Sequence, residues 1–524
     1  MAKQWIRLLV VTLVAVLLAG CSEMWSDGVV AYEDMEYERP DMARMEKSLQ
    51  LAVEAAKDGK LPVIEERIYD FYDEYDWFYT CYSLAELQNF SDMSDLYWQD
   101  EYGYCVKNST EADAMMEELY TALAKSPCRS QLESEEYFGA GYFDSYEDGK
   151  WDSEFVVLLE KENELEMRYL DCYGDALDRE LEEDPFAPYA DELAAVLVEL
   201  IRVRQEIADY CGYENYIEYA SDVYYYRDYT AKQAEIYLKD IQTEMVPLYR
   251  QVCQSDIWDE NLETSTEQDT FAYVRDMAWN MDGKVQNAFR LLDKANLYDL
   301  EFGENKFQTS YEVYLTSYRE PFIFLCPTGS NYDHLTFAHE FGHFCADWAA
   351  YGSYAGADVQ EVFSQGMEYL SLCYGENTEK LTKLKMADSL CLYVEQAAYA
   401  SFEQQMYSLT GEDLRVEELY SLYEKTVQQF GMDSVAYDPW EFVTVSHFYT
   451  DPMYIISYLV SNDAALQLYQ MEMEEKGMGL AWLEEHLDSE ELYILAFLEN
   501  AGLENPFGSG RISAVRQMLE RVLN

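Results

Sequence analysis

Apolar residues recur at three- and four-residue spacing in several long segments of the chain. The clearest of these segments are 45–57, 112–125, 154–173 and 190–210. On an α-helix this spacing gathers the apolar side chains on one face, so the pattern predicts amphipathic helices. Glycine and proline are scarce, at 24 and 11 of 524 residues, and few segments alternate as strands do. The sequence therefore predicts a mostly α-helical fold.

One segment is instead predicted to be a β-strand. Residues 321–326 read Pro-Phe-Ile-Phe-Leu-Cys, and a Pro-Thr-Gly-Ser turn follows at 327–330. A proline at the start suits an edge strand, because proline cannot donate a hydrogen bond to a neighbouring strand. We therefore expect an edge strand to which an extended peptide can add, although a purely structural strand fits the same pattern. Residues 331–333 are suited to cap the helix that comes next.

That next helix carries the motif His339-Glu340-Phe-Gly-His343. Residues four apart share one face of a helix, so the two imidazoles can bind one metal ion, as in the HExxH motif of zinc peptidases. Glu340 lies beside that face, where its carboxylate can take a proton from an attacking water. A chance match is the alternative, but the chain has only five histidines and two of them stand here. Alanines at 346 and 349 replace the glycine and histidine of the metzincin class, which excludes that class.

A catalytic zinc site needs a third protein ligand. A second helix is predicted at 357–370, and it carries Glu361 and Glu368 seven residues apart on one face. Glu361 has a competing interpretation, because Asp358 with Glu361 three residues later resembles a capping box. In that case Glu361 would only satisfy the start of its helix. The pattern alone leaves the third ligand open.

The two motifs together resemble the signature of the thimet oligopeptidase and oligoendopeptidase F family of gluzincins. The resemblance rests on the HExxH motif at 339–343 and on Glu-Val-Phe-Ser-Gln-Gly-Met-Glu at 361–368. The similarity covers roughly residues 150–524, and the N-terminal helices show a weaker likeness. It implies a mostly α, two-lobed metallopeptidase with a deep substrate channel and a small β-sheet next to the HExxH helix. It also implies that Glu361 is the third ligand of one Zn2+ ion. We assign Glu368 to the support of a ligand histidine.

A C-terminal segment that begins at His447 resembles the family's histidine, proline and spaced tyrosines. An Asp-Pro pair at 451–452 is a good helix start, which would place Tyr454 and Tyr458 on one helical face. An imidazole or phenol aimed at a developing oxyanion stabilises its charge. His447 and Tyr458 are our first candidates for this role, and Tyr454 is the next. Core packing is the alternative, because the chain has 48 tyrosines.

The N-terminus resembles a bacterial lipoprotein signal. A positively charged start precedes an apolar run at 8–18, and Leu-Ala-Gly-Cys21 follows. We predict a signal peptide at 1–20, a lipidated Cys21 with a tether to residue 44, an N-terminal helical region at 45–200 and a catalytic region at 201–524. The lipid would hold the protein at a membrane surface outside the cytoplasm. An ordinary secretory signal is the alternative.

Charge and cysteine content exclude other classes of function. Lysine and arginine total 36 against 102 acidic residues, a formal net charge of -66, which repels nucleic acid. The acidic residues are spread along the chain, which favours a solvated acidic surface over a specific attraction for cationic peptides. Ten cysteines follow Cys21 without a CxxC pair, so neither a cysteine zinc site nor a thioredoxin-like motif is expected. Their pairing stays open.

Taken together, these patterns and the resemblance predict a zinc-dependent endopeptidase of short peptides. One alternative is a carboxypeptidase or dipeptidase of a related helical gluzincin type. Such an enzyme needs a cationic clamp for the substrate carboxylate, and the chain is poor in arginine near the motifs. A second alternative is a catalytically silent, peptide-binding lipoprotein, although a pure binder has no need of a complete metal site. The oligomeric state is not predicted.

Overall fold

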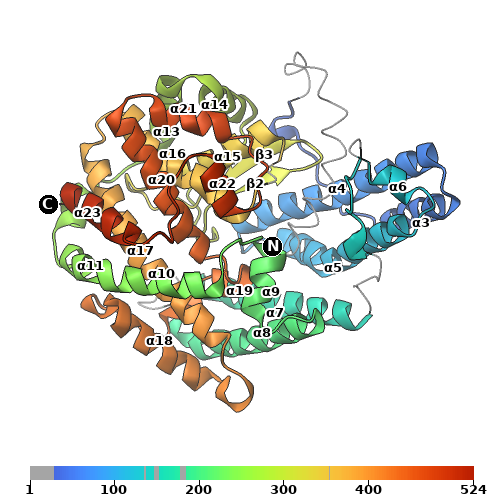
Figure 1. The fold of residues 1–524 in the computed structure, drawn as a ribbon, viewed down its shortest axis with the longest axis horizontal. Helices are drawn as coiled ribbons and strands as arrows, with labels where there is room; N and C mark the ends of the chain where they lie inside the picture. The colour runs from blue at the N-terminus through green and yellow to red at the C-terminus, as the bar shows by residue number, and fades with distance from the viewer. Residues whose placement is uncertain (1–28, 135–136, 147–152, 178–184, 353–354, 524) are drawn as a thin grey trace. The chain divides into compact units, whose positions relative to one another are not determined.

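The computed structural model describes residues 29–134, 137–146, 153–177, 185–352 and 355–523 (Figure 1). The predicted signal peptide and Cys21 lie outside these residues. Within the described residues, no helix is both long enough and apolar enough to cross a membrane. The predicted mostly helical fold is confirmed, since the four segments with helical periodicity form helices, of which the second ends one residue early at Ala124, and the named strands form one small sheet.

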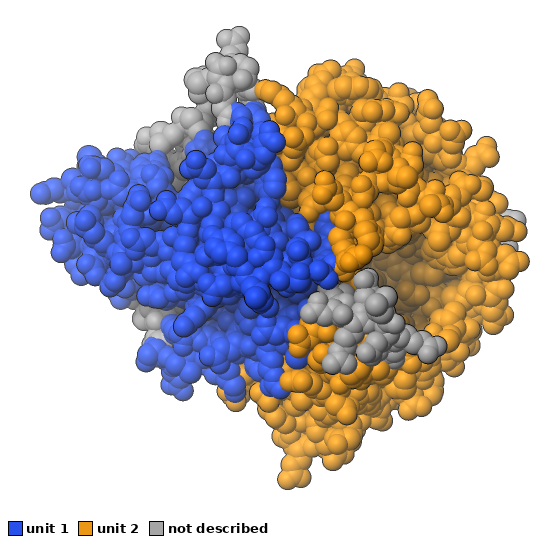
Figure 2. Space-filling view, turned by 180° about the vertical axis from the view of Figure 1, so that it is seen from behind, with its two compact units in different colours: residues 1–174, 305–307, 315–320 blue, residues 175–304, 308–314, 321–524 orange. Residues whose placement is uncertain are grey.

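The chain forms two compact units, which are coloured separately in Figure 2. Unit 1 comprises residues 1–174, 305–307 and 315–320, and unit 2 comprises 175–304, 308–314 and 321–524. The predicted division between a helical region and a catalytic region at residue 201, and the predicted deep channel, stay predictions.

Unit 1 is built around three long helices that pack on one another. These are α3 (Met42–Asp58), α4 (Leu61–Ser91) and α5 (Leu96–Ala124). Asp41 and Asp95 accept hydrogen bonds from the first amides of α3 and α5, which fixes where these helices begin. The core between them is rich in aromatic side chains. The shorter α6 (Arg129–Leu132) and most of α7 (Ser153–Leu177) are the other α-helices among the described residues of this unit.

Unit 2 holds the remaining helices. In chain order they are α8 (Ala190–Tyr210), α9 (Tyr216–Tyr219), α10 (Ala231–Glu244), α11 (Val246–Cys253), α12 (Ile257–Asn261), α13 (Glu267–Met281), α14 (Gly283–Ala295), α15 (Asp333–Ala350), α16 (Ala357–Tyr374), α17 (Glu379–Met406), α18 (Val416–Phe430), α19 (His447–Thr450), α20 (Ile456–Glu474), α21 (Met478–His486), α22 (Ile494–Asn500) and α23 (Arg511–Leu523). The most extensive contacts join α16 to α15 on one side and to α20 on the other. Helix α16 is therefore buried over most of its surface.

A glycine sets the close approach of α15 and α16. A Cβ atom at Gly342 would lie 2.5 Å from the Cα of Ser364 and 2.7 Å from the carbonyl oxygen of Phe363. Atoms cannot approach so closely, so only glycine allows the two backbones to lie at this separation. Gly342 stands inside the HExxH motif, and the contact brings the motif against α16.

The sheet contains β1 (Tyr298–Asp299), β2 (Tyr311–Leu315) and β3 (Glu320–Phe324) in the order β1-β3-β2. The predicted strand forms as β3, but the prediction that it is an edge strand is wrong, because β3 lies in the middle. β1 pairs with it in parallel, with Tyr298 opposite Ile323 and Asp299 opposite Phe324. The pairing with β1 begins two residues after Pro321, so the absence of an N–H group on Pro321 removes no hydrogen bond between β1 and β3. Any added peptide strand would have to use an outer strand.

Candidate active site

Helix α15 brings the HExxH side chains together. The imidazole rings of His339 and His343 lie 5.1 Å apart between centroids. One ligand atom from each of His339, Glu340 and His343 lies within 4.8 Å of the other two. Residues 331–333 do not cap this helix as predicted, because no side chain caps its start. The Asp333 carboxylate instead accepts hydrogen bonds from the amides of the preceding turn at 328–330.

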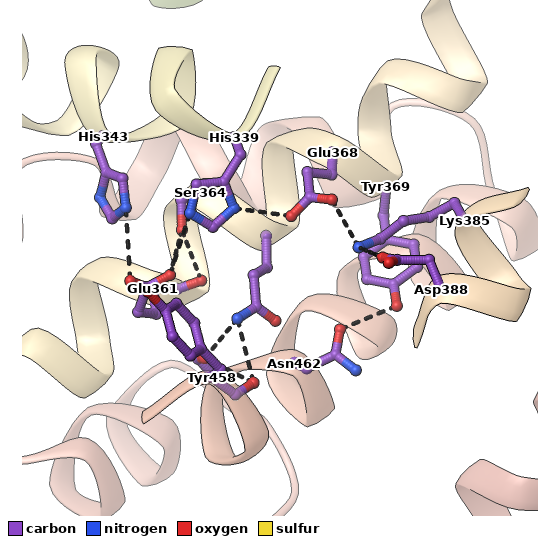
Figure 3. A network of polar contacts seen from close by, with 12 residues as sticks. His339, His343, Glu361, Ser364, Glu368, Tyr369, Lys385, Asp388, Tyr458 and Asn462 are labelled. Carbon is purple, nitrogen blue, oxygen red and sulfur yellow. Dashed lines mark hydrogen bonds and ion pairs between the residues drawn. The ribbon is translucent and has the colours of Figure 1, made fainter. Parts of the chain in front are cut away.

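Helix α16 supplies a carboxylate that faces both imidazoles (Figure 3). Oε2 of Glu361 lies 3.4 Å from Nε2 of His339, and Oε1 lies 3.7 Å from Nε2 of His343. The capping-box interpretation of Glu361 is wrong, because the helix has Gly356 at its N-cap and no side-chain cap. Its carboxylate instead accepts hydrogen bonds from the hydroxyl groups of Ser364 and Tyr454. Two imidazole nitrogens and one carboxylate form a donor set that suits Zn2+.

Glu368 orients one of these imidazoles from behind. Its Oε1 atom lies 2.8 Å from Nδ1 of His339. In the tautomer that carries its proton on Nδ1, His339 donates this hydrogen bond and keeps the lone pair of Nε2 for a metal ion. The other oxygen of Glu368 lies 2.6 Å from Nζ of Lys385 on α17. Figure 3 shows this row of side chains from His339 through Glu368 to Lys385.

Lys385 is a site residue that the sequence analysis did not single out. Its side chain is 1% exposed and also lies 3.2 Å from Asp388, which in turn accepts a hydrogen bond from Tyr332. Burial acts to lower the pKa of Lys385, but Glu368 and Asp388 raise it above the ordinary value. Burial acts to raise the pKa of Glu368, yet Lys385 and His339 hold it below its usual range. Lys385 is therefore an ammonium that keeps Glu368 ionised.

The environment of Glu340 suits a group that both accepts and releases a proton. Burial raises its pKa to about 7, with opposing contributions from His339, which lowers it, and Glu361, which raises it. The backbone amide of Glu312 on β2 donates a hydrogen bond to the Glu340 carboxylate. Glu312 is partly buried beside Asp347, and burial and that neighbour raise the pKa of Glu312 well above its usual range. The sheet therefore lies next to the HExxH helix as predicted, and Glu312 is a second neighbour that the sequence analysis missed.

The three C-terminal candidates also meet at this site. Nε2 of His447 lies 3.0 Å from the hydroxyl of Tyr458, and the rings of Tyr454 and Tyr458 lie 5.2 Å apart. Burial raises the pKa of both phenols well above 10 and lowers the pKa of His447. At neutral pH the two phenols therefore keep their protons and are able to donate hydrogen bonds.

The predicted helix start at 451–452 is wrong. Helix α20 begins at Ile456, so Tyr454 lies in the loop that joins α19 to α20. Met453 in this loop has φ of 68°, a left-handed conformation that ends any helical path from Pro452. Tyr454 reaches the site from the loop, not from a shared helical face.

Known proteins share part of this sequence and its fold. Residues 32–149 match the peptidase M3 N-terminal domain. A crystal structure of a candidate oligoendopeptidase F superposes with a TM-score of 0.82 at 22% identity, over 94% of this chain and 98% of that one. The chain therefore carries a segment that matches the M3 N-terminal domain, and its fold is oligoendopeptidase F-like. The resemblance stated from the sequence is thereby confirmed.

Two further structures share this fold. PZ peptidase A, solved with an inhibitor, has a TM-score of 0.81 at 20% identity and covers 94% of this chain and 99% of its own. A candidate oligoendopeptidase F from Bacillus anthracis strain Ames has a TM-score of 0.80 at 20% identity, with 95% and 98% coverage. The TM-scores show that this chain shares the fold of these structures. No curated protein sequence matched the chain.

Proposed function

We propose that the protein is a zinc-dependent endopeptidase that hydrolyses short peptides. The observation that carries this proposal is the convergence of His339, His343 and Glu361, with Glu340 beside them. Three protein ligands of this kind leave a position open at a catalytic zinc ion. The M3 N-terminal domain and the oligoendopeptidase F-like structure support peptides as the substrate class.

A bound zinc ion would supply a Lewis acid that polarises the scissile carbonyl group. In the proposed reaction, Glu340 accepts a proton from the attacking water and delivers it to the nitrogen of the leaving amine. A pKa of about 7 suits this double role, because the carboxylate then gains and loses a proton at little cost near neutral pH. Glu368 and Lys385 hold the imidazole of His339 in the tautomer that the site needs.

The developing oxyanion is the second charge that the site must stabilise. Tyr458 keeps its phenolic proton because burial raises its pKa, and His447 pairs with it at 3.0 Å. We infer that Tyr458 donates a hydrogen bond to the oxyanion and that His447 orients the phenol or joins it as a donor.

The cations near the site support internal cleavage over terminal cleavage. A carboxypeptidase needs a cation that binds the free carboxylate of its substrate. Lys385 is already paired with Glu368 and Asp388 behind the metal ligands, and Arg227 donates to the carbonyl oxygen of Met453. Both of these buried cations are therefore committed to contacts within the protein.

We also propose that the protein is a lipoprotein held outside the cytoplasm by its N-terminal lipid. The sequence Leu-Ala-Gly-Cys21 after an apolar run supports this proposal. A lipid anchor would place a peptidase at the membrane surface, where peptides arrive from the surrounding medium.

Metal analysis combined with a peptidase assay tests the proposed function. We expect one zinc ion per chain and cleavage of an internally quenched peptide that is blocked at both ends. A chelator should abolish cleavage, and added zinc should restore it. Cleavage only of peptides with a free C-terminus would favour the carboxypeptidase alternative. Stoichiometric zinc without cleavage of any peptide would contradict the proposal.

A further inference from the structure

The loop that carries the C-terminal site residues has an unusual backbone. Helix α19 ends at Thr450 and α20 begins at Ile456, so Tyr454 stands on irregular chain between them. Met453, the residue before it, adopts the left-handed conformation without being a glycine. A side chain with a Cβ atom rarely adopts this conformation unless surrounding contacts impose it. The loop therefore needs contacts that hold it.

Two of these contacts come from an arginine on α8. The guanidinium of Arg204 donates to the carbonyl oxygen of Phe448 at 2.8 Å and to that of Tyr449. Arg204 is completely buried. Its target carbonyls belong to α19, directly after His447, so they fix the short helix on which that imidazole stands.

A second arginine holds the other half of the loop. Arg227 donates to the carbonyl oxygen of Met453 at 2.8 Å and to the hydroxyl of Ser457 at 3.0 Å. The hydroxyl of Tyr225 donates to the carbonyl oxygen of Pro452 at 2.8 Å, and the Arg227 guanidinium lies 4.3 Å from the centre of the Tyr225 ring. These donors fix both peptide groups that flank the left-handed residue.

A buried carboxylate also contacts the backbone of this loop. Oε1 of Glu403 on α17 accepts a hydrogen bond from the amide of Met453 at 2.6 Å. The strained residue is therefore held at its amide by Glu403 and at its carbonyl by Arg227. Tyr454 follows Met453 in the chain, and its hydroxyl donates a hydrogen bond to Glu361. The backbone conformation of Met453 therefore sets the direction in which the Tyr454 side chain leaves the loop.

The same arginine connects the loop to the helix of the third metal ligand. Nε of Arg227 lies 3.5 Å from Oδ1 of Asp358, and the hydroxyl of Ser457 donates to the same oxygen. Asp358 lies on α16, three residues before Glu361. The side chains of Arg227 and Asp358 are each 2% exposed, so both charges are withdrawn from water. Burial of charged groups is costly unless they are paired, so the ion pair with Arg227 and the hydrogen bond from Ser457 offset the cost of burying Asp358.

We propose that Arg204 and Arg227 are positioning residues, which hold the backbone of residues 447–458 so that Tyr454 contacts the Glu361 carboxylate and His447 pairs with Tyr458. We define the five side chains that make these contacts as the loop clamp: Arg204, Tyr225, Arg227, Asp358 and Glu403. The catalytic consequence rests on the proposed peptidase function. The structural consequence, a loop held in one conformation, does not.

The test uses a conservative change with a matched control. Arg227→Lys keeps the positive charge but removes the planar fork that reaches Met453, Ser457 and Asp358 together. Arg511→Lys is the control. Arg511 donates hydrogen bonds to both carboxylate oxygens of buried Asp463, which lies on α20. None of its described contacts is with residues 447–458. Tyr225→Phe removes only the hydroxyl that donates to Pro452, and it replaces Arg227→Lys as the test variant if Arg227→Lys does not fold.

Two readouts are needed on the zinc-loaded protein. Hydrogen exchange measured by mass spectrometry should show faster exchange in a peptide covering 447–458 for Arg227→Lys, and unchanged exchange there for Arg511→Lys. With a quenched peptide, kcat of Arg227→Lys should fall by about 10- to 100-fold while KM changes little, since misplacement of catalytic groups by about 1 Å costs up to about 100-fold. Tyr225→Phe should show the same pattern with a smaller loss.

The outcomes separate this proposal from the proposed function. A wild-type protein that cleaves no peptide refutes the peptidase assignment, and the exchange data still decide whether the clamp holds the loop. Unchanged exchange in both Arg227→Lys and Tyr225→Phe overturns the proposal. Faster exchange with an unchanged kcat in an active enzyme also overturns it, because the loop would then move without consequence. An equal loss of kcat in Arg511→Lys would show a general loss of stability and overturns it as well.

Discussion

The hydroxyl of Tyr454 donates a hydrogen bond to Oε1 of Glu361, the oxygen that also faces the imidazole of His343. The neighbouring phenol of Tyr458 has a different partner, because it lies 3.0 Å from Nε2 of His447. Two tyrosines with the same predicted role therefore stand in different relationships to the site. Tyr454 contacts the carboxylate of the proposed third metal ligand, and Tyr458 contacts the imidazole of His447.

Tyr454→Phe and Tyr458→Phe should consequently fail in different ways. Loss of the Tyr454 hydroxyl leaves Glu361 less well oriented, so zinc affinity should fall by about 10-fold or more, as is typical of groups that support a ligand. Loss of the Tyr458 hydroxyl should leave zinc affinity intact and lower kcat by about 100- to 1,000-fold, the usual effect of removing one oxyanion donor. Competition with a zinc indicator and steady-state kinetics measure the two quantities. An identical zinc affinity and kcat in the two variants would contradict the division of roles.

Glu340→Gln should separate metal binding from turnover. The amide keeps the shape of the side chain but cannot accept the proton of the attacking water, so kcat should fall by at least about 100-fold. Zinc content should stay at the wild-type value, because the proposed ligands are untouched. Exposed Glu376 offers a matched change, and Glu376→Gln should keep full activity. Normal turnover by zinc-loaded Glu340→Gln would refute the assigned base.

Glu361 and Glu368 should differ in what their removal does to zinc. Glu361→Ala removes a carboxylate that faces both imidazoles, whereas Glu368→Ala removes only the partner of Nδ1 of His339. Glu368→Ala should cost about 10- to 100-fold in zinc affinity or activity, and Glu361→Ala should cost more. Zinc titration of both variants measures this order. If Glu361→Ala bound zinc like the wild type, the third ligand would have to be sought elsewhere, first at Glu368.

Cys21→Ser tests the proposed lipid anchor. Without a thiol for lipid attachment, the protein should move from the membrane fraction to the soluble fraction of the expressing cells. Its specific activity on a quenched peptide should not change, since residue 21 precedes the predicted catalytic region. Mass spectrometry of the wild-type N-terminal peptide should show the added lipid. A Cys21→Ser protein that still sediments with membranes would rule out this anchor.

The metal motif was predictable because its geometry is local. The spacing of His339 and His343 alone places both on one helical face, and the position of Glu340 follows from it. Glu361 and Glu368 were also found on one face of the next helix, although the pattern could not choose between ligand and cap. Packing made that choice, because Gly342 brings the two helices close enough for the Glu361 carboxylate to face both imidazoles.

Other features depend on contacts that no local pattern contains. Lys380, Lys383 and Lys385 occur in one short stretch of α17, and only the packing of that helix makes Lys385 the buried one. The Asp-Pro pair at 451–452 is a sound helix signal, yet Arg227 and Glu403 hold the following backbone in a loop from 226 and 50 residues away. The central place of β3 likewise depends on strands that precede it in the chain.

The contact at Gly342 yields the last prediction. In Gly342→Ala, the new methyl group would lie 2.5 Å from the backbone of Ser364, so α15 and α16 must separate. Overpacking of this kind costs about 1–3 kcal/mol of unfolding free energy, and the separation should also move the two imidazoles away from Glu361. We expect a lower melting temperature together with a weaker zinc affinity. Gly103→Ala is the matched control, because Gly103 lies inside α5 and a Cβ there meets no atom within 4 Å. That change should raise stability slightly, since alanine is favoured over glycine within helices, and should leave zinc binding unchanged. Wild-type zinc affinity in Gly342→Ala would mean that the helix separation does not control the metal site.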